Sequence, residues 1–471
     1  MREDFMDILD ELRGIIGARH VLTGADTARW DSDWIGKYKG APLCVVRPAN
    51  TDEVSRVMAL AHDTGTPVVP VGGNTGLSGG AFGRGAVMLS VDRMNALRDL
   101  RPEARIAIVE AGVVLSALHD AAEAHDLVFP MTFGAKGSCM IGGMLATNAG
   151  GSNVVRYGNT RALCLGLEIV LPDGEVLELM SELHKDNSGY DLKDLFIGSE
   201  GTLGVITAAV LKLSPKPRAY ATAMVAAPGL AQALDLLNRL QEATGGAVEA
   251  FEYMPASYID AHIAKTGARA PFAARHEVNI LVEVGATAAR DAALAADGSV
   301  PIVDYLEEVL AGLMEEGAVL DAVIAQNDAQ RTEMWERREA AAEVTLDRQP
   351  LVNNDIAVPL DKVSVFLERM AEELPRLDRG ADSLCVAHLG DGNIHYAVFP
   401  SDPTLVDPVM EKVEDVVGAL GGSFSAEHGI GLSKKPSMAR RKNPVALRVM
   451  RQIKGVLDPK GIMNPGKVLP D

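Results

Sequence analysis

The chain has 471 residues, of which 47% are hydrophobic and 23% charged, and its formal net charge at pH 7 is −19. This composition is typical of a soluble globular protein, and the length is too great for one hydrophobic core, so we expect two or three domains. The excess of acidic residues argues against a nucleic-acid-binding protein and against electrostatic docking on anionic lipid, because both need basic surfaces.

Cysteine usage and the N-terminal sequence indicate the compartment. The four cysteines, Cys44, Cys139, Cys164 and Cys385, are scattered and form no Cys-x-x-Cys pair, so we expect reduced thiols in a cytosol. The N-terminus is acidic and lacks the apolar core of a signal peptide. No apolar run approaches the roughly 20 residues needed to cross a bilayer. We therefore expect a cytoplasmic protein with no transmembrane segment, and peripheral contact with the inner membrane face stays open.

The N-terminal half predicts a helical segment at 1–36, followed by strands and helices in alternation. Asn50 and Glu53 have the spacing of a capping box, and Gly65 ends the helix that they begin. Two prolines, Pro215 and Pro217, mark a domain boundary. The predicted strands lie at 43–46, 67–71, 86–91, 105–110 and 205–213, with a further helix at 115–125.

Beyond the two prolines glycine becomes sparser and alanine commoner, and the pattern predicts an α+β segment. The whole chain then divides into an N-terminal segment at 1–36, a glycine-rich domain at 37–217, an α+β domain at 218–420 and a C-terminal segment at 421–471. The later predicted helices lie at 230–244, 304–314, 326–347 and 445–456, and the later predicted strands at 248–253 and 278–284.

Three glycine-rich segments lie in the domain at 37–217, at residues 72–80, 137–151 and 198–204. Successive backbone amides in such loops form concavities that bind anions such as pyrophosphate. The first loop lacks the Gly-Lys-Ser/Thr ending of a P-loop, and its spacing does not fit the Rossmann fingerprint. One such loop could be a structural turn, but three predict a large, thin ligand that lies against backbone at several points, as a dinucleotide would.

A hairpin with two histidines is predicted at 385–396. An apolar strand runs into His388, an Asp-Gly turn follows, and the second strand contains His395. The two imidazoles would meet across the turn, and Glu427 would complete the two-histidine, one-carboxylate pattern of a catalytic metal site. His428 would be left over as a base. The alternative is that these are ordinary solvated or core histidines, because a motif match is only a hypothesis.

The glycine-rich segments resemble the flavin-binding motifs of the FAD-linked D-2-hydroxyacid dehydrogenases. This group contains the D-lactate, glycolate and D-2-hydroxyglutarate dehydrogenases and lies within the vanillyl-alcohol oxidase superfamily. The matching stretches are 70–80, 146–151 and 196–204, and the stretches 388–395, 425–431 and 458–467 resemble the C-terminal motifs of the same family. The resemblance extends from about residue 37 to the end of the chain.

The resemblance implies an α+β fold with a two-lobed FAD-binding domain of the vanillyl-alcohol oxidase type. A substrate or cap domain with an antiparallel sheet follows, and the C-terminal segment returns to the flavin. Members that attach FAD covalently often have His where this chain has Asn74, so we expect non-covalent FAD. The implied cofactor contacts are Pro70, Gly72, Gly73, Asn74, Thr75, Gly76, Leu77, Gly79, Gly80, Gly137, Ser138, Gly142, Gly143, Thr147, Asn148, Gly150, Glu200, Gly201, Ile206 and Asn464.

The resemblance also implies oxidation of a D-2-hydroxyacid to the 2-oxoacid, with flavin N5 as the acceptor of the C2 hydride. A divalent metal on His388, His395 and Glu427 would polarise the substrate oxygens, and His428 would take the hydroxyl proton. We expect Zn first, with Mn, Fe and Co as alternatives, because all four accept histidine and carboxylate ligands. The alternative for His428 is that it orients Glu427.

Substrate binding is expected from Asn393, from His428 and from Arg338, whose planar guanidinium matches a carboxylate. The alternative for Arg338 is a solvated helix charge. Enzymes for D-2-hydroxyglutarate tend to have threonine and lysine where this chain has Ala342 and Asn353. This chain therefore has fewer polar groups with which to bind a distal carboxylate of the substrate. The sequence predicts another substrate, such as the monocarboxylate D-lactate.

Two other classes of protein stay open at this stage. One is a non-redox transferase on the same scaffold, as in the alkyl-dihydroxyacetone-phosphate synthases, and the other is a metal hydrolase without flavin. The absence of an NAD-binding fingerprint of the Rossmann type argues against nicotinamide as the electron acceptor. Quinone, an electron-transfer flavoprotein, a cytochrome and oxygen remain as acceptors, and an oligomer is possible.

Overall fold

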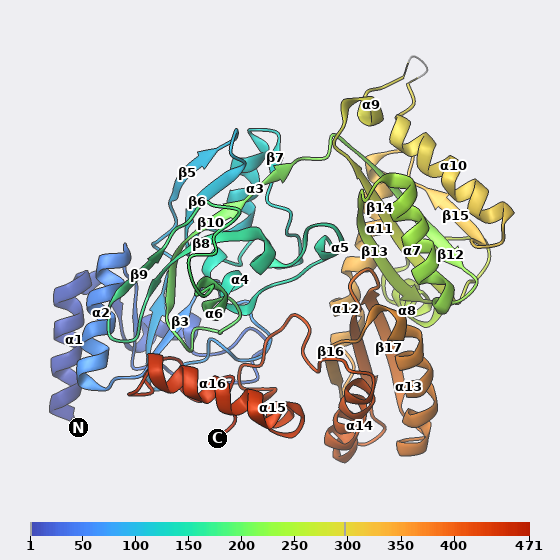
Figure 1. The fold of residues 1–471 in the computed structure, drawn as a ribbon. Helices are drawn as coiled ribbons and strands as arrows, with labels where there is room; N and C mark the ends of the chain where they lie inside the picture. The colour runs from blue at the N-terminus through green and yellow to red at the C-terminus, as the bar shows by residue number, and fades with distance from the viewer. Residues whose placement is uncertain (1, 296–297) are drawn as a thin grey trace. The chain divides into compact units, whose positions relative to one another are not determined.

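The computed structural model describes residues 2–295 and 298–471, and these residues form two compact units (Figure 1). Unit 1 comprises the chain up to Gly150, then Asn159–Ser214 and Glu427–Asp471. Unit 2 comprises Gly151–Gly158 and Pro215–Ala426. The chain therefore passes from one unit to the other several times.

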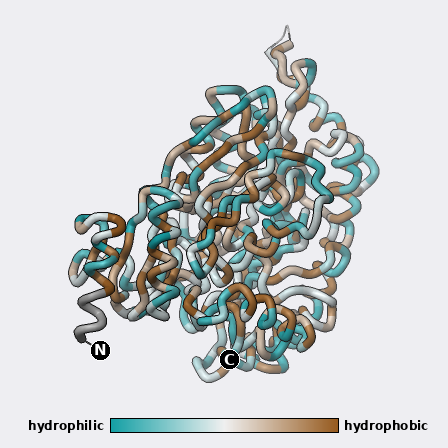
Figure 2. The backbone as a smooth tube through the Cα atoms, turned by 60° about the vertical axis from the view of Figure 1, so that its left-hand side comes forward, coloured by the Kyte–Doolittle hydropathy of each residue, from teal (hydrophilic) through white to brown (hydrophobic). Residues whose placement is uncertain are grey.

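A four-stranded sheet in unit 1 has the strand order β1-β2-β4-β3, in which β2, β4 and β3 are parallel. Asn50 is the N-cap, as predicted, because its Oδ1 accepts from the amide of Glu53 at 2.9 Å, and Gly65 ends the helix with φ 66°. The return bond of the capping box goes to a neighbouring residue, because Glu53 Oε2 accepts the amide of Ala49 at 2.7 Å rather than that of Asn50. Figure 2 shows hydrophobic and hydrophilic residues alternating along the helices near the N-terminus. The bounds are α1 Arg2–Ile16, β1 Val21–Leu22, β2 Cys44–Val46, α2 Thr51–Thr64, β3 Val68–Val71 and β4 Val87–Ser90.

The second sheet of unit 1 is antiparallel, with the order β5-β6-β10-β8-β9. Its central strand β10 is the predicted strand at 205–213, and it is buried along almost its whole length. The bounds are β5 Leu97–Arg101, β6 Ile106–Glu110, α3 Leu115–Glu123, β7 Leu127–Val128, α4 Ile141–Thr147, β8 Cys164–Val170, β9 Val176–Leu179, α6 Lys193–Phe196, β10 Val205–Lys212, α15 Lys435–Arg441 and α16 Pro444–Leu457.

Unit 2 is built on a seven-stranded antiparallel sheet with the order β15-β12-β14-β13-β17-β18-β16. The strands are β12 Ala219–Ala227, β13 Val248–Pro255, β14 Val278–Ala286, β15 Asp321–Ile324, β16 Val352–Ala357, β17 Asp382–His388 and β18 Asn393–Phe399. The helices are α5 Val154–Tyr157, α7 Leu230–Thr244, α8 Ala256–Thr266, α9 Ala289–Ala292, α10 Pro301–Glu315, α11 Asp328–Glu339, α12 Ala341–Leu346, α13 Val363–Leu377 and α14 Val406–Ala419.

The two faces of this sheet differ, because side chains alternate between them along each strand. One face forms a large apolar core with α7, α10, α13 and α14, which includes Phe251 and Val398. The opposite face packs Met254 and Leu281 against residues of α8, α11 and α12. Strand register places His388 on that second face, because it is paired with Glu252, which in turn is paired with Leu281. His388 and Glu252 therefore lie on the same face of the sheet as a small apolar core.

Most predicted elements agree with the structure to within a few residues, and two do not. The helical segment predicted at 1–36 contains the short strand β1, which pairs with β2. The helix predicted at 326–347 is divided into α11 and α12 at Ala340, whose φ of −69° and ψ of 0° end the first helix and begin the second. The four cysteines are free, in agreement with the predicted reduced thiols, and all four are buried. Among the described residues, no helix has the length and apolar character needed to cross a membrane.

Candidate functional site

The three glycine-rich segments come together in unit 1. Gly73 lies against the backbone of Ser138, so that the first segment contacts the second. The amide of Gly198 donates to the carbonyl of Leu145 at 2.9 Å, and the amide of Glu200 donates to that of Ala146 at 2.8 Å. These hydrogen bonds link the third segment to the second, and the structure thus brings together three stretches that the sequence proposed as one ligand site.

Glycine is required where these loops touch. A Cβ atom on Gly73 would lie 2.1 Å from the carbonyl oxygen of Ser138, which no side chain tolerates. A Cβ atom on Gly79 would lie 2.6 Å from the ring of Tyr38, and Gly79 also has a φ of 71°. Asn74 adopts a φ of 55°, which asparagine tolerates better than most residues, and its side-chain amide donates to the carbonyl of Ser32 at 3.1 Å. The backbone, rather than side chains, shapes this part of the site.

The C-terminal segment of unit 1 packs onto the same loops. Ser78 Oγ donates to the carbonyl of His428 at 3.0 Å. The Glu200 carboxylate accepts the amides of Ile430 at 2.7 Å and Gly431 at 2.8 Å. Burial raises the pKa of Glu200, although these two amides oppose the rise. The loop at 198–204 therefore holds the stretch around residue 430 in place.

Asn464 joins the first and third glycine-rich segments. Its side-chain amide donates to the carbonyl of Gly80 at 2.9 Å and to that of Glu200 at 2.7 Å. Its own Oδ1 is buried and has no hydrogen-bond partner within the described part of the chain. A buried acceptor without a partner fits a site that binds a donor group of a cofactor.

Other predicted cofactor residues divide into those with internal roles and those in open space. Thr147 Oγ1 donates to the carbonyl of Gly143, and Asn148 Oδ1 accepts the amide of Arg161 at 2.9 Å. A Cβ atom on Gly142 would meet Ala111, one on Gly201 would meet Pro70, and one on Gly150 would meet the Glu427 carboxylate. Thr75 and Leu77 lie in the first loop, and Ile206 lies on β10, 7% exposed. A Cβ atom on Gly76, Gly137 or Gly143 would have no described atom within 4 Å.

The predicted hairpin in unit 2 is confirmed, with β17 and β18 joined by a turn in which Gly392 has a φ of 83°. The rings of His388 and His395 lie at 80° to each other with centroids 5.3 Å apart. One ligand nitrogen of each ring lies within 4.8 Å of one of the other. This spacing allows both imidazoles to bind one metal ion.

Glu252 orients both His388 and Arg338. Its Oε1 lies 2.8 Å from His388 Nδ1, and its Oε2 accepts from Arg338 Nε at 2.7 Å, with all three side chains buried. Because an ionised carboxylate only accepts, His388 Nδ1 bears the hydrogen of this contact, and the neutral form of the ring then has its lone pair on Nε2. Burial raises the pKa of Glu252, but His388 and Arg338 lower it more, and the net pKa is below its usual value.

The sequence reasoning missed Glu252, although a glutamate in the apolar strand at 248–253 is a detectable signal. It also predicted Arg338 as an open binding group. In the structure the guanidinium of Arg338 pairs with Glu252 and lies 3.4 Å from His388 Nε2. The carboxylate-binding role of Arg338 therefore stays a prediction.

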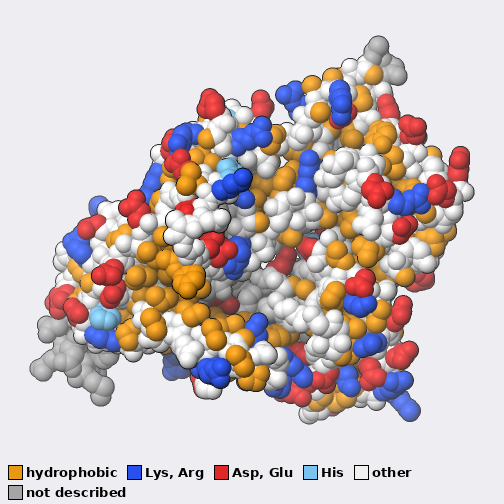
Figure 3. All heavy atoms as spheres, in the orientation of Figure 1, with side chains coloured by type: hydrophobic (Ala, Val, Ile, Leu, Met, Phe, Trp, Pro, Cys, Tyr) orange, Lys and Arg blue, Asp and Glu red, His pale blue; other side chains and the backbone are white. Residues whose placement is uncertain are grey.

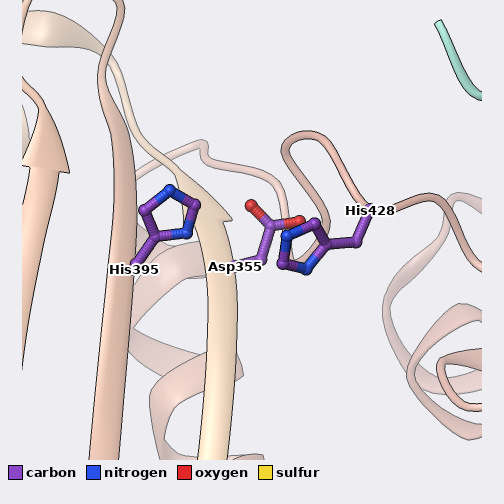
Figure 4. A group of neighbouring side chains, drawn as sticks. All are labelled: Asp355, His395 and His428. Carbon is purple, nitrogen blue, oxygen red and sulfur yellow. The ribbon is translucent and has the colours of Figure 1, made fainter. Parts of the chain in front are cut away.

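Asp355 is a second carboxylate that the sequence reasoning missed. Figure 4 shows Asp355 and His395 on neighbouring strands, and their register pairs them directly. A carboxylate oxygen of Asp355 lies within 4.8 Å of a ring nitrogen of His395. Asp355 Oδ1 also accepts from Asn393 Nδ2 at 3.0 Å. Asn393 Oδ1 is buried without a partner among the described residues, so this acceptor fits a bound donor such as a substrate hydroxyl.

Glu427 and His428 belong to unit 1, where the chain leaves unit 2 after Ala426. The amide of Ala426 donates to the carbonyl of Asp355 at 3.2 Å, which fixes the end of unit 2 beside β16. Chain connectivity then keeps the Cα atom of Glu427 about 3.8 Å from that of Ala426. Binding of a metal by Glu427 and proton transfer by His428 stay predictions.

Comparison with known proteins identifies the family. Residues 216–468 match the model of the C-terminal domain of FAD linked oxidases, and residues 42–180 match that of the FAD binding domain. The chain is 38% identical to D-2-hydroxyglutarate dehydrogenase of Xanthomonas citri pv. viticola, over 94% of this chain and 93% of that protein. It is 35% identical to mitochondrial D-2-hydroxyglutarate dehydrogenase of Bos taurus, over 98% of this chain and 84% of that protein.

Solved structures show the same fold. The structure of p-cresol methylhydroxylase with substrate bound matches with a TM-score of 0.73 and 15% identity, over 100% of this chain and 98% of that one. A structure of alkyldihydroxyacetonephosphate synthase matches with a TM-score of 0.70 and 18% identity, over 98% and 84%. The predicted α+β fold of the vanillyl-alcohol oxidase type is confirmed. The chain belongs to the FAD-linked D-2-hydroxyacid dehydrogenase family and is an FAD-dependent oxidoreductase.

Proposed function

We propose that the protein oxidises a D-2-hydroxyacid to the 2-oxoacid with non-covalent FAD and a divalent metal. FAD would lie on the three glycine-rich segments of unit 1, where backbone amides neutralise its pyrophosphate. The metal would bind to His388, His395 and Glu427. The observation that supports the metal best is the buried Glu252, which fixes the tautomer of His388.

The donor set fits a catalytic metal. A ligating histidine normally donates its other ring N–H to a carboxylate, as His388 does to Glu252 at 2.8 Å. Two histidines and one carboxylate leave coordination positions open for substrate oxygens. Zn is the first candidate, and Mn, Fe and Co use the same ligand types. Asp355, next to His395 on the neighbouring strand, is a further carboxylate for this ion.

The bound groups and the residues of the chain would each have a separate role in the reaction. FAD supplies the hydride acceptor, and the metal supplies Lewis-acid polarisation of the substrate oxygens. His428 takes the hydroxyl proton, for which an imidazole has a suitable pKa. Asn393 accepts a hydrogen bond at its buried Oδ1, and Arg338 binds the substrate carboxylate.

The substrate is proposed to be a monocarboxylate of the D-lactate type. Asn353 and Asp355 are two residues apart on β16, so they lie on the same face of the sheet. A lysine at position 353 would bring a cation to that face, and asparagine does not. Ala342 is exposed on α12 and offers no hydroxyl. D-2-Hydroxyglutarate is the second candidate, because the relatives described above are named for it.

The experiment is an anaerobic titration of the metal-replete protein with D- and L-2-hydroxyacids while the flavin absorbance is recorded. We expect D-lactate to bleach the flavin band more rapidly than D-2-hydroxyglutarate, L-acids to have no effect, and a chelator to abolish the bleaching. A faster reaction with D-2-hydroxyglutarate would contradict the monocarboxylate proposal. Bleaching that survives complete metal removal would contradict the metal.

The proposed base has its own test. Replacing His428 with Asn should slow flavin bleaching by about 10²- to 10⁴-fold, the usual effect of removing a general base, with normal FAD and metal content. His125→Asn, on an exposed histidine of unit 1, is the control and should be unchanged. A yellow protein that no hydroxyacid bleaches would instead favour the non-redox transferase.

A further inference from the structure

The two C-terminal helices form a basic stretch in an acidic protein. Residues 428–457 contain eight of the 45 Lys and Arg residues of the chain and no Asp or Glu, whereas the whole chain has a formal net charge of −19. Two of the eight, Lys435 and Lys454, form ion pairs with Asp471 and Asp458, which lie outside this range, so the local excess of positive charge is smaller than the count. A local excess of one sign creates a potential that attracts partners of the opposite sign. In Figure 3, basic and hydrophobic side chains are mixed over the part of the surface where Figure 1 places α15 and α16.

The outer side of α16 combines charge with exposed apolar groups. Val445, Val449 and Val456 are 54%, 44% and 79% exposed. Their spacing of four and seven residues puts them on one face of the helix. Lys442, just before the helix, and Arg448 within it are also exposed. An aligned apolar stripe with basic neighbours is typical of a surface that binds another molecule. We call these five residues the α16 face.

The inner side of α16 contacts the glycine-rich loop at 198–204. Lys454 Nζ donates to the carbonyl of Thr202 at 2.6 Å and to that of Met463 at 2.8 Å. Lys454 is nine residues after Val445, which puts it on the opposite side of the helix. The α16 face is thus separated from the proposed flavin loop by one helix, about 10 Å across.

We propose that the α16 face is the docking surface for an acidic protein that accepts electrons one at a time. The inference rests on the proposed function, because it needs a reduced flavin in unit 1. Oxidation of one hydroxyacid to the oxoacid releases two electrons and two protons. Two acceptor molecules take one electron each, and the protons pass to solvent.

Charge and side-chain type favour a protein over a lipid surface. Basic side chains steer an acidic partner towards the face, and the small valines can form the apolar centre of a contact. A helix that lies in a membrane interface has Trp, Phe or Leu on its apolar face, and the exposed stripe of α16 has only valines.

The test compares two charge-reversal variants with equal changes in net charge. The first is Lys442→Glu/Arg448→Glu, which leaves Arg451 intact because Arg451 donates to the carbonyl of Pro470. The matched control is Arg269→Glu/Arg290→Glu in unit 2, where both side chains are more than 80% exposed, at 87% and 86%. The probes are cytochrome b5, which has an acidic haem edge, cytochrome c, which has a basic one, and a small dye.

The wild-type protein should reduce cytochrome b5 with a higher kcat/KM than cytochrome c, and added salt should remove the difference. The Lys442→Glu/Arg448→Glu variant should lose about tenfold or more in kcat/KM for cytochrome b5 and keep dye-linked turnover. The control should resemble the wild type in both assays. If the wild type showed no turnover with the dye, the proposed function itself would have failed, and not only the docking surface.

Three outcomes would overturn the docking proposal. The first is equal cytochrome b5 reduction by the variant and the wild type, and the second is an equal loss in the control. The third is binding to another occupant. Sedimentation of the wild type with vesicles of phosphatidylglycerol and phosphatidylcholine, absent in the variant, would assign the face to lipid. A dimer that dissociates only in the variant would assign it to a second copy of the chain.

Discussion

The two proposed ligand sites are built from different parts of the chain. In unit 1 the proposed ligand surface is backbone, and its shape depends on glycines that permit loops to touch, as Gly73 does at Ser138. In unit 2 the proposed site is a set of buried charged side chains on one face of a sheet, with Glu252 between Arg338 and His388. We therefore expect ligand binding in unit 1 to be lost when a glycine gains a side chain. In unit 2 we expect stability and ligand binding to fall when a buried side chain loses its charge at constant volume.

The largest expected effect is steric and concerns unit 1. In Gly73→Ala the new Cβ atom would lie 2.1 Å from the carbonyl oxygen of Ser138, so the two loops must separate. We expect the purified variant to retain less than about a tenth of the wild-type FAD, because backbone amides bind only where the loops place them. The ratio of flavin to protein absorbance measures the loss.

Gly76→Ala is the matched control in the same loop. A Cβ atom there has no described atom within 4 Å, and the φ of Gly76 is not in the left-handed region. This variant should keep its FAD. Equal flavin content in the two variants would show that contact between the loops does not shape the cofactor site.

The second expected effect is electrostatic and concerns unit 2. Glu252→Gln keeps the volume but leaves Arg338 buried without its carboxylate, which should cost about 3–5 kcal/mol in the free energy of unfolding. It should also weaken metal binding by about 10- to 100-fold, because His388 loses its orienting carboxylate. Urea unfolding and competition with a chromophoric chelator measure the two effects.

The control for this variant is Glu316→Gln, at an exposed ion pair with Arg239, and this change should lower the free energy of unfolding by less than about 1 kcal/mol.

The pH dependence of the free energy of unfolding gives a further check on Glu252→Gln. Since the pKa of Glu252 is lowered in the folded state, its stabilising effect is present above the usual glutamate range. It is lost as the pH falls through the lowered pKa. The wild type should therefore lose its advantage over Glu252→Gln in acid, and a constant difference would contradict the ion-pair account.

The same contrast explains what the sequence could predict. A glycine that is needed for a close approach or a turn is visible at its own position, so the loops at 72–80, 137–151 and 198–204 and the hairpin turn could be located. The partners in unit 2 could not be found in this way. Glu252 and His388 are 136 residues apart, and only the register of β13 with β17 brings them together. Apart from a tight hairpin, such as that of β17 and β18, the sequence did not show which strands pair.

Asp355 illustrates the same limit. It follows two asparagines on β16, and nothing in that local pattern distinguishes a buried carboxylate from an exposed one. In the structure it is 1% exposed and accepts a hydrogen bond from Asn393. Arg338 was found through a family motif, but its pairing with Glu252 depends on how α11 packs on the sheet. Residue types could be predicted from the sequence, and the pairs that set their charge could not.

The smallest expected effect concerns a buried charge in unit 1, where backbone groups otherwise dominate. Burial and, to a smaller extent, the nearby Lys435 lower the pKa of Lys467 to about 8, although Glu200 opposes the shift. Between this value and the usual lysine pKa the unfolded chain binds more protons than the folded one, so stability rises with pH across that window.

Lys467→Met removes the penalty of the buried cation and should stabilise flavin-free protein at pH 7 by about 1 kcal/mol or more. The gain should shrink as the pH rises past 8, whereas Lys442→Met, at an exposed lysine, should show neither the gain nor the pH dependence. A gain that is the same at pH 7 and pH 10, both measured by urea unfolding, would show that packing rather than charge limits stability at this position, as it does in the glycine-rich loops.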